Sequence, residues 1–486
     1  MNPQPAATSP RKVVVVGAGI AGLSAAARLR ERGIEVTVLE ASPSIGGKLA
    51  LGEVAGIPVD VGAESILNRR PEGTELARRA GLADRLVHPA TISANLWSRG
   101  VMRAMPRTVM GVPTDARALA ESGVISKAGL ARAALDAVLP ATRLEGQDVS
   151  VGWLVEERFG KEVVDRLVEP LLGGVYAGHA RELSARAAVP QVVALLDRDK
   201  SMLKAAAGSQ ATTLADVPVF AGLVGGVGQL PVAVATSAGI DVRTSSTVRD
   251  LVRRDGGGWS LVVGSAHEPE LVEADAVVLA TPAGATSRLL ADVVPAAAME
   301  LARIEYASVA VLTLAFRRRD FPETTGSGFL VPPVDKRDIK AATYSFAKWD
   351  WVREVGIGTD NGEDLLVMRC SVGRHREEQV LQATDEELVQ TALEELCEAI
   401  GLSVRPVDWQ VQRWGGGLPQ YAVGHVEIVR HIRSAVATEP GLAVCGAAYD
   451  GLGIPACIAS AELAVTQVVD GRDGQEEWTH DASSNP

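Results

Sequence analysis

The stretch VVVVGAGIAGLSAAARLRERGIEVTVLEASPSIGGK, residues 13–48, decides the fold. Its four valines predict a strand buried on both faces, because parallel strands covered by helices are continuous runs of Val and Ile. Gly17, Gly19 and Gly22 follow. The first permits a tight turn, the second lets backbone approach a pyrophosphate, and the third lets a helix over residues 20–32 pack on the sheet. The stretch therefore predicts a Rossmann unit that binds a dinucleotide.

Glu40 ends the next apolar run, IEVTVLE. A carboxylate at the end of this second strand can accept hydrogen bonds from a ribose diol, an interaction of roughly 1.5–3 kcal/mol. The first amides of the helix, at Ile20 and Ala21, are expected to face the phosphates. A lone GxGxxG motif is a weak signal. Here strand, turn, helix, second strand and terminal acid all agree, which makes a purely structural turn a poor explanation.

Two further motifs distinguish NAD from FAD. ASPSIGGK supplies Gly46 and Gly47 beside Lys48, and VDVGAE follows at residues 59–64. Together they resemble the extended FAD-binding region of glutathione-reductase-like flavoproteins, particularly the monoamine oxidase branch. That branch usually has Arg after the glycine pair, so Lys48 is a departure that keeps the charge and loses the bidentate fork. The resemblance implies an FAD cofactor and an α/β fold (α+β overall).

Flavoproteins of this branch build the cofactor domain from separated segments, and residues 223–235, 239–263, 274–285 and 441–465 match the later ones. Many relatives have Asp after the first glycine of the last turn. In this chain Ala447 follows Gly446, so only backbone contacts are expected there. The cofactor-binding residues that the resemblance implies are Gly17, Gly19, Ile20, Ala21, Gly22, Glu40, Ala41, Gly46, Gly47, Lys48, Gly62, Ala63, Glu64, Val248, Thr281, Gly446, Gly453, Ile454, Pro455 and Ala456.

The remaining sequence predicts a substrate domain with a mixed sheet and a mostly helical subdomain. Alternating stretches such as SVAVLTLAFRR and DLLVMRCSVG indicate strands, and DEELVQTALEELCEAIG indicates a covering helix. The expected division is a glutathione-reductase-type Rossmann FAD domain (1–70, 211–290, 435–470), a substrate domain (71–101, 291–434), a helical subdomain (102–210) and a disordered polar tail (471–486).

Composition narrows the function classes. The chain of 486 residues has a net charge of −12, which argues against a nucleic-acid partner and gives anionic ligands no general attraction. Four cysteines without metal-ligand spacing indicate buried free thiols and neither a disulfide framework nor a metal. No signal, transit or membrane-spanning pattern is evident, so we expect a cytoplasmic protein. Peripheral attachment at the inner face of a membrane, through the apolar stretches GVYAG and VPVFAGLV, stays open.

Several longer stretches resemble the porphyrinogen oxidases of haem synthesis. They are ATISANLWSRGVMRAMP, EPLLGGVYAGHARELSARAAVPQ, FAGLVGGVGQLPVAV, GSGFLVPPVD, QRWGGGLPQYAVGH and YDGLGIPACIAS, spread over nearly the whole chain in the expected order. The resemblance implies a six-electron oxidation in which FAD accepts a hydride three times and oxygen becomes hydrogen peroxide. An external acceptor is also expected because the chain has one convincing dinucleotide fingerprint. No general base is assigned, since loss of a pyrrole proton balances the charge.

The resemblance leaves two porphyrinogens as candidate substrates. Coproporphyrinogen III is favoured over protoporphyrinogen IX because ATISANLWSRGVMRAMP resembles the bacterial members that oxidise it. The rival interpretations are another flavin amine oxidase or carotenoid desaturase, and a non-catalytic protein that binds flavin or porphyrin. Transient contact with ferrochelatase or another enzyme of the pathway is a further expectation.

Four carboxylates on the substrate require local cations. Candidates are Arg69, Arg70, Lys340, Lys348 and Arg374, each expected to be a solvated surface charge because most Lys and Arg are exposed. Arg70 and Arg374 are the preferred substrate-binding pair.

Two neutral residues complete the predicted substrate site, and three others are expected to be structural. Ser371 stands where plant relatives have an aromatic residue against the tetrapyrrole, and Leu330 offers an apolar wall. Tyr176, His179 and His425 lie in stretches that resemble the family, yet they are expected to support the fold rather than the reaction.

Overall fold

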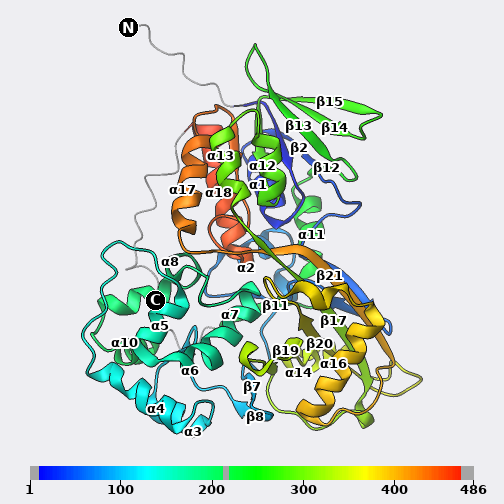
Figure 1. Cartoon of the computed structure of the whole chain (residues 1–486). Helices are drawn as coiled ribbons and strands as arrows, with labels where there is room; N and C mark the ends of the chain where they lie inside the picture. Colours follow the sequence, from blue (N-terminus) through cyan, green and yellow to red (C-terminus); the bar gives the residue numbers. More distant parts are fainter. Residues whose placement is uncertain (1–9, 212–217, 472–486) are drawn as a thin grey trace.

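The computed structural model describes residues 10–211 and 218–471. Figure 1 shows a parallel sheet with its helices in the upper part of the view, and a second sheet and a group of short helices below it. The predicted disorder of the tail falls outside the described residues, apart from Gly471. No helix within the described ranges is long and apolar enough to cross a membrane.

The upper sheet is parallel throughout. The valines of its central strand are almost completely buried, because helices or a second sheet cover both faces. This confirms the Rossmann prediction. The strands in spatial order are β12 (Asp241–Arg243), β2 (Glu35–Leu39), β1 (Lys12–Val16), β16 (Ala276–Leu279) and β22 (Leu442–Val444).

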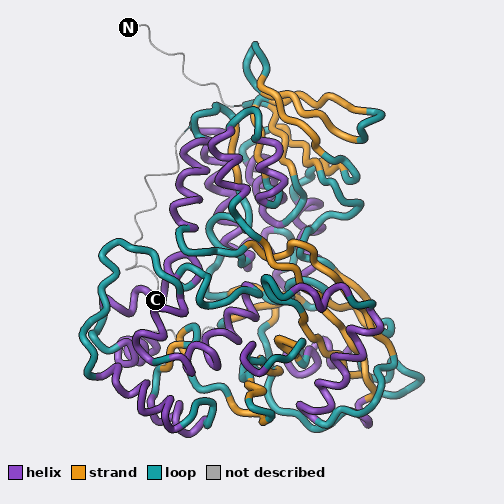
Figure 2. Tube along the Cα trace, viewed as in Figure 1, coloured by secondary structure: helices purple, strands orange, loops and turns teal. Residues whose placement is uncertain are grey.

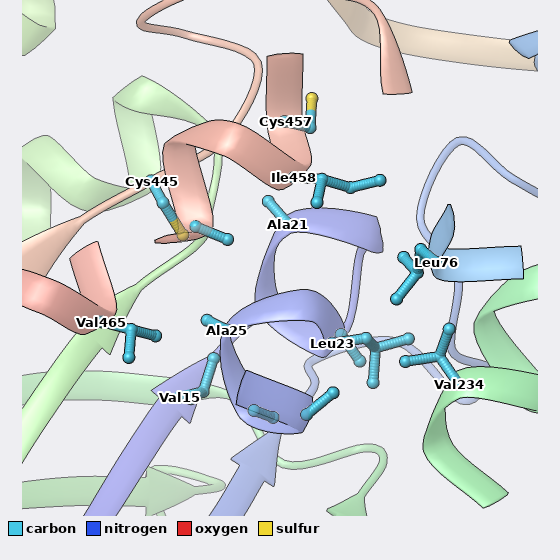
Figure 3. Packing of buried hydrophobic residues seen from close by; sticks show 14 of the residues in the cluster. Val15, Ala21, Leu23, Ala25, Leu76, Val234, Cys445, Cys457, Ile458 and Val465 are labelled. Atoms are coloured by element: carbon cyan, nitrogen blue, oxygen red, sulfur yellow. The ribbon is translucent and has the colours of Figure 1, made fainter. Parts of the chain in front are cut away.

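One face of the parallel sheet is covered by α1 (Ile20–Glu31), α2 (Glu72–Arg79), α11 (Leu230–Ser237) and α18 (Ile454–Asp470). Figure 3 shows α1 between the others, with Ala21 and Ala25 facing α18 and Leu23 facing α2 and α11. Small residues such as Ala21 and Ala25 let α1 and α18 pack closely against each other beside β1.

The other face carries an antiparallel sheet and a helical layer (Figure 2). The hairpin predicted at residues 255–258 joins two of its strands, as expected. Two helices of this layer, α13 (Pro295–Ala302) and most of α17 (His425–Val436), fall in the predicted substrate segment 291–434, but they pack on the parallel sheet through residues such as Leu301 and Ile432. The elements are β13 (Val248–Arg253), β14 (Trp259–Gly264), β15 (Pro269–Ala274), α12 (Ala283–Leu290), α13 (Pro295–Ala302) and α17 (His425–Val436).

The second large sheet is mixed, since its neighbours are antiparallel except for the parallel pair β7 and β18. In spatial order its strands are β21 (Asp408–Pro419), β17 (Tyr306–Arg317), β20 (Leu365–Val372), β19 (Ile339–Thr343), β18 (Gly328–Leu330), β7 (Asn95–Ser98) and β8 (Val101–Ala104). The helix α16 (Asp385–Ile400), which begins with a capping box at Thr384, packs on one face. On the opposite face, Ala315, Leu365 and Val367 pack against residues 54–61 and 349–352, and the site described below lies on this same face.

The remaining elements form the helical region and small sheets. Its core contains the buried ion pair of Arg158 with Asp136. A π-helical segment, Val164–Val168, leads directly into α7. The helices are α3 (Ala116–Ser122), α4 (Lys127–Ala134), α5 (Val151–Phe159), α6 (Lys161–Val163), α7 (Glu169–Tyr176), α8 (Ala185–Ala188), α9 (Pro190–Val193), α10 (Met202–Ala211), α14 (Ser345–Lys348) and α15 (Asp350–Val355). The short strands are β3 (Leu51–Val54), β4 (Ile57–Asp60), β5 (Ile66–Leu67), β6 (Leu86–Val87), β9 (Thr108–Val109), β10 (Val112–Pro113) and β11 (Phe220–Leu223).

Candidate active site

The turn between β1 and α1 has the shape of a phosphate cradle. Gly17 has φ +105°, and a Cβ there would lie 2.9 Å from the Ala280 carbonyl oxygen. A Cβ on Gly22 would lie 1.9 Å from the Gly17 oxygen, so helix and turn touch at this point. A Cβ on Gly19 would meet no atom within 4 Å. The turn therefore leaves open space above Gly19, beside the amides that begin α1, where a pyrophosphate would fit.

Glu40 lies beside this turn. Its Oε2 accepts a hydrogen bond from the Ala18 amide at 2.7 Å, and its Oε1 accepts one from the Ser42 amide at 2.8 Å. The Glu40 carbonyl accepts the Ser246 amide at 2.7 Å, which brings the segment before Val248 next to it. Because each carboxylate oxygen has two lone pairs, Glu40 can hold the turn and still accept from a ribose hydroxyl.

The second glycine pair closes over the first turn. The Gly46 amide donates to the Ala18 carbonyl at 2.8 Å, and the Ala63 amide donates to the Lys48 carbonyl at 3.0 Å. A Cβ on Gly62 would lie 2.0 Å from the Lys48 oxygen, so this strand-like contact requires glycine. Burial lowers the pKa of the Lys48 ammonium, and Cys457 in α18 acts in the opposite direction. Three segments distant in sequence thus converge on one cradle.

The amino terminus of α18 points into the same region. Gly446 has φ +122°, and its backbone lies against Ala21 of α1. The helix begins at Ile454, with Pro455 in its first turn and no side-chain cap at Gly453. Its first amides therefore remain available for an anionic group. The predicted cofactor residues of both helices come together, whereas Ala41 is exposed beside them.

Glu64, predicted as a cofactor contact, is bound by two cations. Its carboxylate lies 2.5 Å from Lys348 Nζ and 2.9 Å from Arg369 Nη1. These charges outweigh burial and lower the pKa of Glu64 to about 2. Arg369 also donates to the Gly62 carbonyl at 2.6 Å, which ties the cofactor segment to β20. Sequence analysis missed Arg369, although alternation along β20 places it on the same face as Ser371.

A row of residues crosses the face of the mixed sheet that lies opposite α16. Leu330 is paired with Ala341, Ala341 with Ser371, and Ser371 with Val311. Directly paired residues point to the same side, so the predicted contacts Leu330 and Ser371 share one face. A Cβ on Gly174 of α7 would lie 3.6 Å from Leu330 Cδ2, which shows that α7 passes over this row.

The expectation that the cationic candidates are solvated is wrong for three of them. Lys340, Lys348 and Arg374 are largely buried because they lie between the mixed sheet and neighbouring segments. Arg69 is exposed, and Arg70, whose side chain is 39% exposed, pairs with Glu72. Of the two residues preferred as substrate contacts, Arg70 is therefore a partly exposed, paired charge, whereas Arg374 is a buried one.

The aromatic and histidine candidates have structural partners. Tyr176 donates to the Ala188 carbonyl at 3.0 Å, and a His179 ring nitrogen lies 3.1 Å from the His375 carbonyl. His425 stacks on Tyr421 with ring centroids 4.0 Å apart, and burial lowers the pKa of His425 to about 4. It is therefore neutral at pH 7.

The expected burial of the thiols holds for three of the four cysteines. Cys370, Cys445 and Cys457 are buried, whereas Cys397 is exposed because it lies on the outer side of α16. The exposed position makes the prediction wrong for this cysteine.

The glycine cradle, the acid at the end of β2 and the uncapped α18 are features of a Rossmann-type fold, and Arg369 ties a second sheet to the segment at Gly62. The sequence matches the family described as flavin containing amine oxidoreductase over residues 20–469, so the chain belongs to this family.

The names of individual relatives indicate a narrower activity than the family description does. The chain is 36% identical over 477 residues to the coproporphyrinogen III oxidase of Mycobacterium tuberculosis, covering 96% of this chain and 99% of the relative. Identity to the Bacillus subtilis protein of the same name is 29%, with coverage of 94% and 98%. A crystal structure from Exiguobacterium sp. 255-15, provisionally assigned as a protoporphyrinogen oxidase, superposes with a TM-score of 0.83 at 29% identity, covering 96% and 100%.

Proposed function

We propose that the chain is an FAD-dependent oxidase that converts coproporphyrinogen III to coproporphyrin III, with molecular oxygen as electron acceptor and hydrogen peroxide as product. The observation that carries this proposal is the 36% identity, over 96% of the chain, to a mycobacterial enzyme named for this substrate. The convergence of the cradle segments and their link to the second sheet support the proposal.

FAD fits the residues around the cradle. The open space at Gly19 would take the pyrophosphate, Glu40 would accept from the ribose, and the amides of α18 would lie at the polar edge of the ring system. Lys48 would add a positive charge that is partly removed from water. When bound, the flavin supplies a hydride acceptor.

The protein's own task is to position the macrocycle and exclude water. A methylene bridge between two pyrroles is an activated hydride donor, and a pyrrole nitrogen can release the compensating proton. The row of Leu330 and Ser371 presents a face without a bulky ring, against which a flat tetrapyrrole can lie. Holding the reacting carbon about 3–3.5 Å from its acceptor is the main catalytic requirement, so no side chain is assigned as a base.

Protoporphyrinogen IX is the second candidate substrate. A bovine relative named protoporphyrinogen oxidase is 28% identical over 94% of this chain, and the Exiguobacterium structure is provisionally assigned to the same activity. The two substrates differ in carboxylate number, four against two. A site that uses the additional carboxylates would favour coproporphyrinogen.

The test is turnover of purified, flavin-loaded protein with the two porphyrinogens side by side, followed by porphyrin fluorescence and oxygen consumption. We expect kcat/KM for coproporphyrinogen III to exceed that for protoporphyrinogen IX about tenfold or more, a difference of about 1.4 kcal/mol in transition-state stabilisation. The reverse preference would reassign the substrate. Anaerobic coproporphyrinogen should bleach the flavin absorbance, and a failure to bleach would indicate binding without oxidation.

A further inference from the structure

Lys340 and Arg374 are two buried cations that lie close together without an acidic partner. Lys340 is 4% exposed and Arg374 is 5% exposed. Their hydrogen bonds go to backbone: Lys340 Nζ donates to the Gly373 carbonyl at 3.0 Å, and Arg374 Nη1 donates to the Arg337 carbonyl at 3.1 Å. The Nε and Nη2 atoms of Arg374 are buried without any hydrogen-bond partner among the residues that the structure describes. A buried charge in this state is unfavourable unless something else satisfies it.

Arg158 shows how the same protein treats a buried arginine that has only a structural role. It is 2% exposed, and its Nε donates to Asp136 Oδ1 at 2.6 Å. Its terminal nitrogens donate to three carbonyl oxygens at 2.6–2.8 Å, those of Pro140, Asp136 and Lys200. All three guanidinium nitrogens of Arg158 are therefore hydrogen-bonded, whereas Nε and Nη2 of Arg374, which are equally enclosed, have no hydrogen-bond partner among the described residues.

The carboxylates around Arg374 do not fill this edge. Glu377, Glu395, Asp338 and Glu169 act on its charge through space. Within the described ranges, however, none approaches Arg374 or Lys340 within the 4.0 Å of a salt bridge. Glu395 is already engaged, because it accepts the amides of Asp338 and Ile339 at 3.0 and 2.9 Å. Burial, together with the charge of Arg374, lowers the pKa of Lys340 to about 7. An added anion would offset both effects.

Lys340 and Arg374 follow closely along the chain on members of this residue row, beside the point where β20 ends. The register of β19 and β20 shifts between Ile339 and Ala341, so Lys340 is the additional residue at this irregularity. Ala341 is paired with Ser371, and Arg374 follows two residues after β20 ends at Val372. The His375 amide donates to the Ala177 carbonyl at 2.7 Å, which holds the residues after β20 against the segment that follows α7.

We propose that Lys340 and Arg374 form a subsite for one carboxylate side arm of the tetrapyrrole, with Leu330 and Ser371 beneath the ring. This assignment rests on the proposed function. The free Nε and Nη2 form the edge of the guanidinium that binds a carboxylate in a bidentate manner, and Lys340 adds a second charge. The two cations thus select an acidic side arm over a neutral one.

The test uses the flavin-loaded variants Lys340→Met and Arg374→Met with Arg376→Gln as a matched control. Arg376 is two residues from Arg374, but its side chain is 61% exposed and paired with Glu182 and Glu305. We measure the Kd for coproporphyrin III by fluorescence quenching, and kcat and KM for coproporphyrinogen III and for its uncharged tetramethyl ester. Thermal unfolding of each variant is followed in parallel.

The subsite predicts that both Met variants raise Kd and KM for the acid about 10- to 100-fold, as expected for loss of a charge-assisted hydrogen bond, with kcat little changed. The ester should be unaffected, the Arg376 variant should match the wild type, and Arg374→Lys should recover part of the affinity. Tm should stay constant or rise, because replacing unpaired buried charges by apolar side chains relieves their desolvation.

Two results would overturn the subsite: unchanged coproporphyrin binding in both Met variants, or equal losses for acid and ester together with a lower Tm, which would make the pair structural. Because porphyrin binding is measured without turnover, failure of the proposed function gives a different pattern. In that case the wild type oxidises no porphyrinogen, while its binding of coproporphyrin still depends on Lys340 and Arg374.

Discussion

Gly19 and Gly22 lie in the same turn, yet an added side chain would meet different surroundings at each. At Gly22 a Cβ would collide with the Gly17 carbonyl at 1.9 Å, and this oxygen belongs to backbone that cannot move aside as a flexible side chain could. At Gly19 a Cβ would point into open space. One glycine is therefore required by packing of the protein itself, and the other by whatever approaches the turn.

This difference predicts opposite outcomes for two alanine variants. Gly22→Ala should destabilise the protein by about 1–3 kcal/mol or more through overpacking, visible as a lower Tm even without flavin. Gly19→Ala should leave the Tm of the flavin-free protein unchanged but lower the bound flavin about tenfold or more, since the methyl group occupies the phosphate position. Flavin content is read from absorbance after desalting. If Gly19→Ala keeps its flavin, the phosphate does not lie above this turn.

The local motif could be predicted at the residue scale, but the burial of Lys340 and Arg374 could not. The cradle glycines act on atoms a few positions away, so the sequence pattern contains the reason for them. Arg374 is buried among segments distant in sequence: its neighbour His375 donates to Ala177, about two hundred residues earlier, and Arg374 itself donates to the Arg337 carbonyl. Because most lysines and arginines are exposed, the sequence predicts that they are surface charges, and only tertiary contacts show which of them are buried.

At the scale of elements, the ion cluster of Glu64, Lys348 and Arg369 joins the cofactor segment to the mixed sheet. The Glu64 side chain is 15% exposed and its two partners are no more than 17% exposed, so water screens the cluster little. The cluster is the direct polar link between the strand-like segment at Gly62 and β20.

We expect Glu64→Gln to destabilise the protein by about 3 kcal/mol at pH 7, because the folded-state pKa of Glu64 falls from 4.5 to about 2 and two cations lose their partner. A depressed folded pKa contributes stability above the unfolded pKa and loses it as pH falls through the folded value. The difference between wild type and variant should therefore shrink between pH 5 and pH 2.

Urea unfolding at several pH values measures this difference. Glu121→Gln is the control, because Glu121 pairs with Arg117 at the surface with 63% of its side chain exposed, and it should change stability by less than about 0.5 kcal/mol. A pH-independent gap between wild type and Glu64→Gln would show that packing, and not charge, accounts for the effect.

The sequence predicted whether a segment forms a helix or a strand over most of the chain. It predicted less well which of the two sheets each element packs on. The alternation of β17 and β20 and the apolar stripe of α16 are properties of single segments, and they appear as expected. The helices α13 and α17 flank the mixed-sheet strands in sequence but complete the parallel-sheet layer in space. Their apolar stripes indicate that they pack on a sheet, and they do not indicate which of the two sheets.

At the scale of the whole molecule, the acidic balance and the proposed substrate oppose each other. The chain carries a net charge of −12, and coproporphyrinogen III carries four carboxylates. Arg376, an exposed arginine two residues from Arg374, is paired with Glu182 and Glu305 and so adds little positive surface. In the proposed subsite, Lys340 and Arg374 are buried and act only after the substrate has approached.

Long-range repulsion between the acidic protein and the anionic substrate weakens as ionic strength rises, whereas the interaction with the buried pair depends little on salt. The Debye length falls from about 30 Å at 0.01 M salt to about 8 Å at 0.15 M. We therefore expect KM for coproporphyrinogen III to fall on the order of several-fold over this range, while KM for the uncharged tetramethyl ester stays constant. Steady-state kinetics at fixed pH measure both. A KM that rises with salt would mean that the substrate approaches across a positive surface, and the buried pair would then be only the last of several cations that it meets.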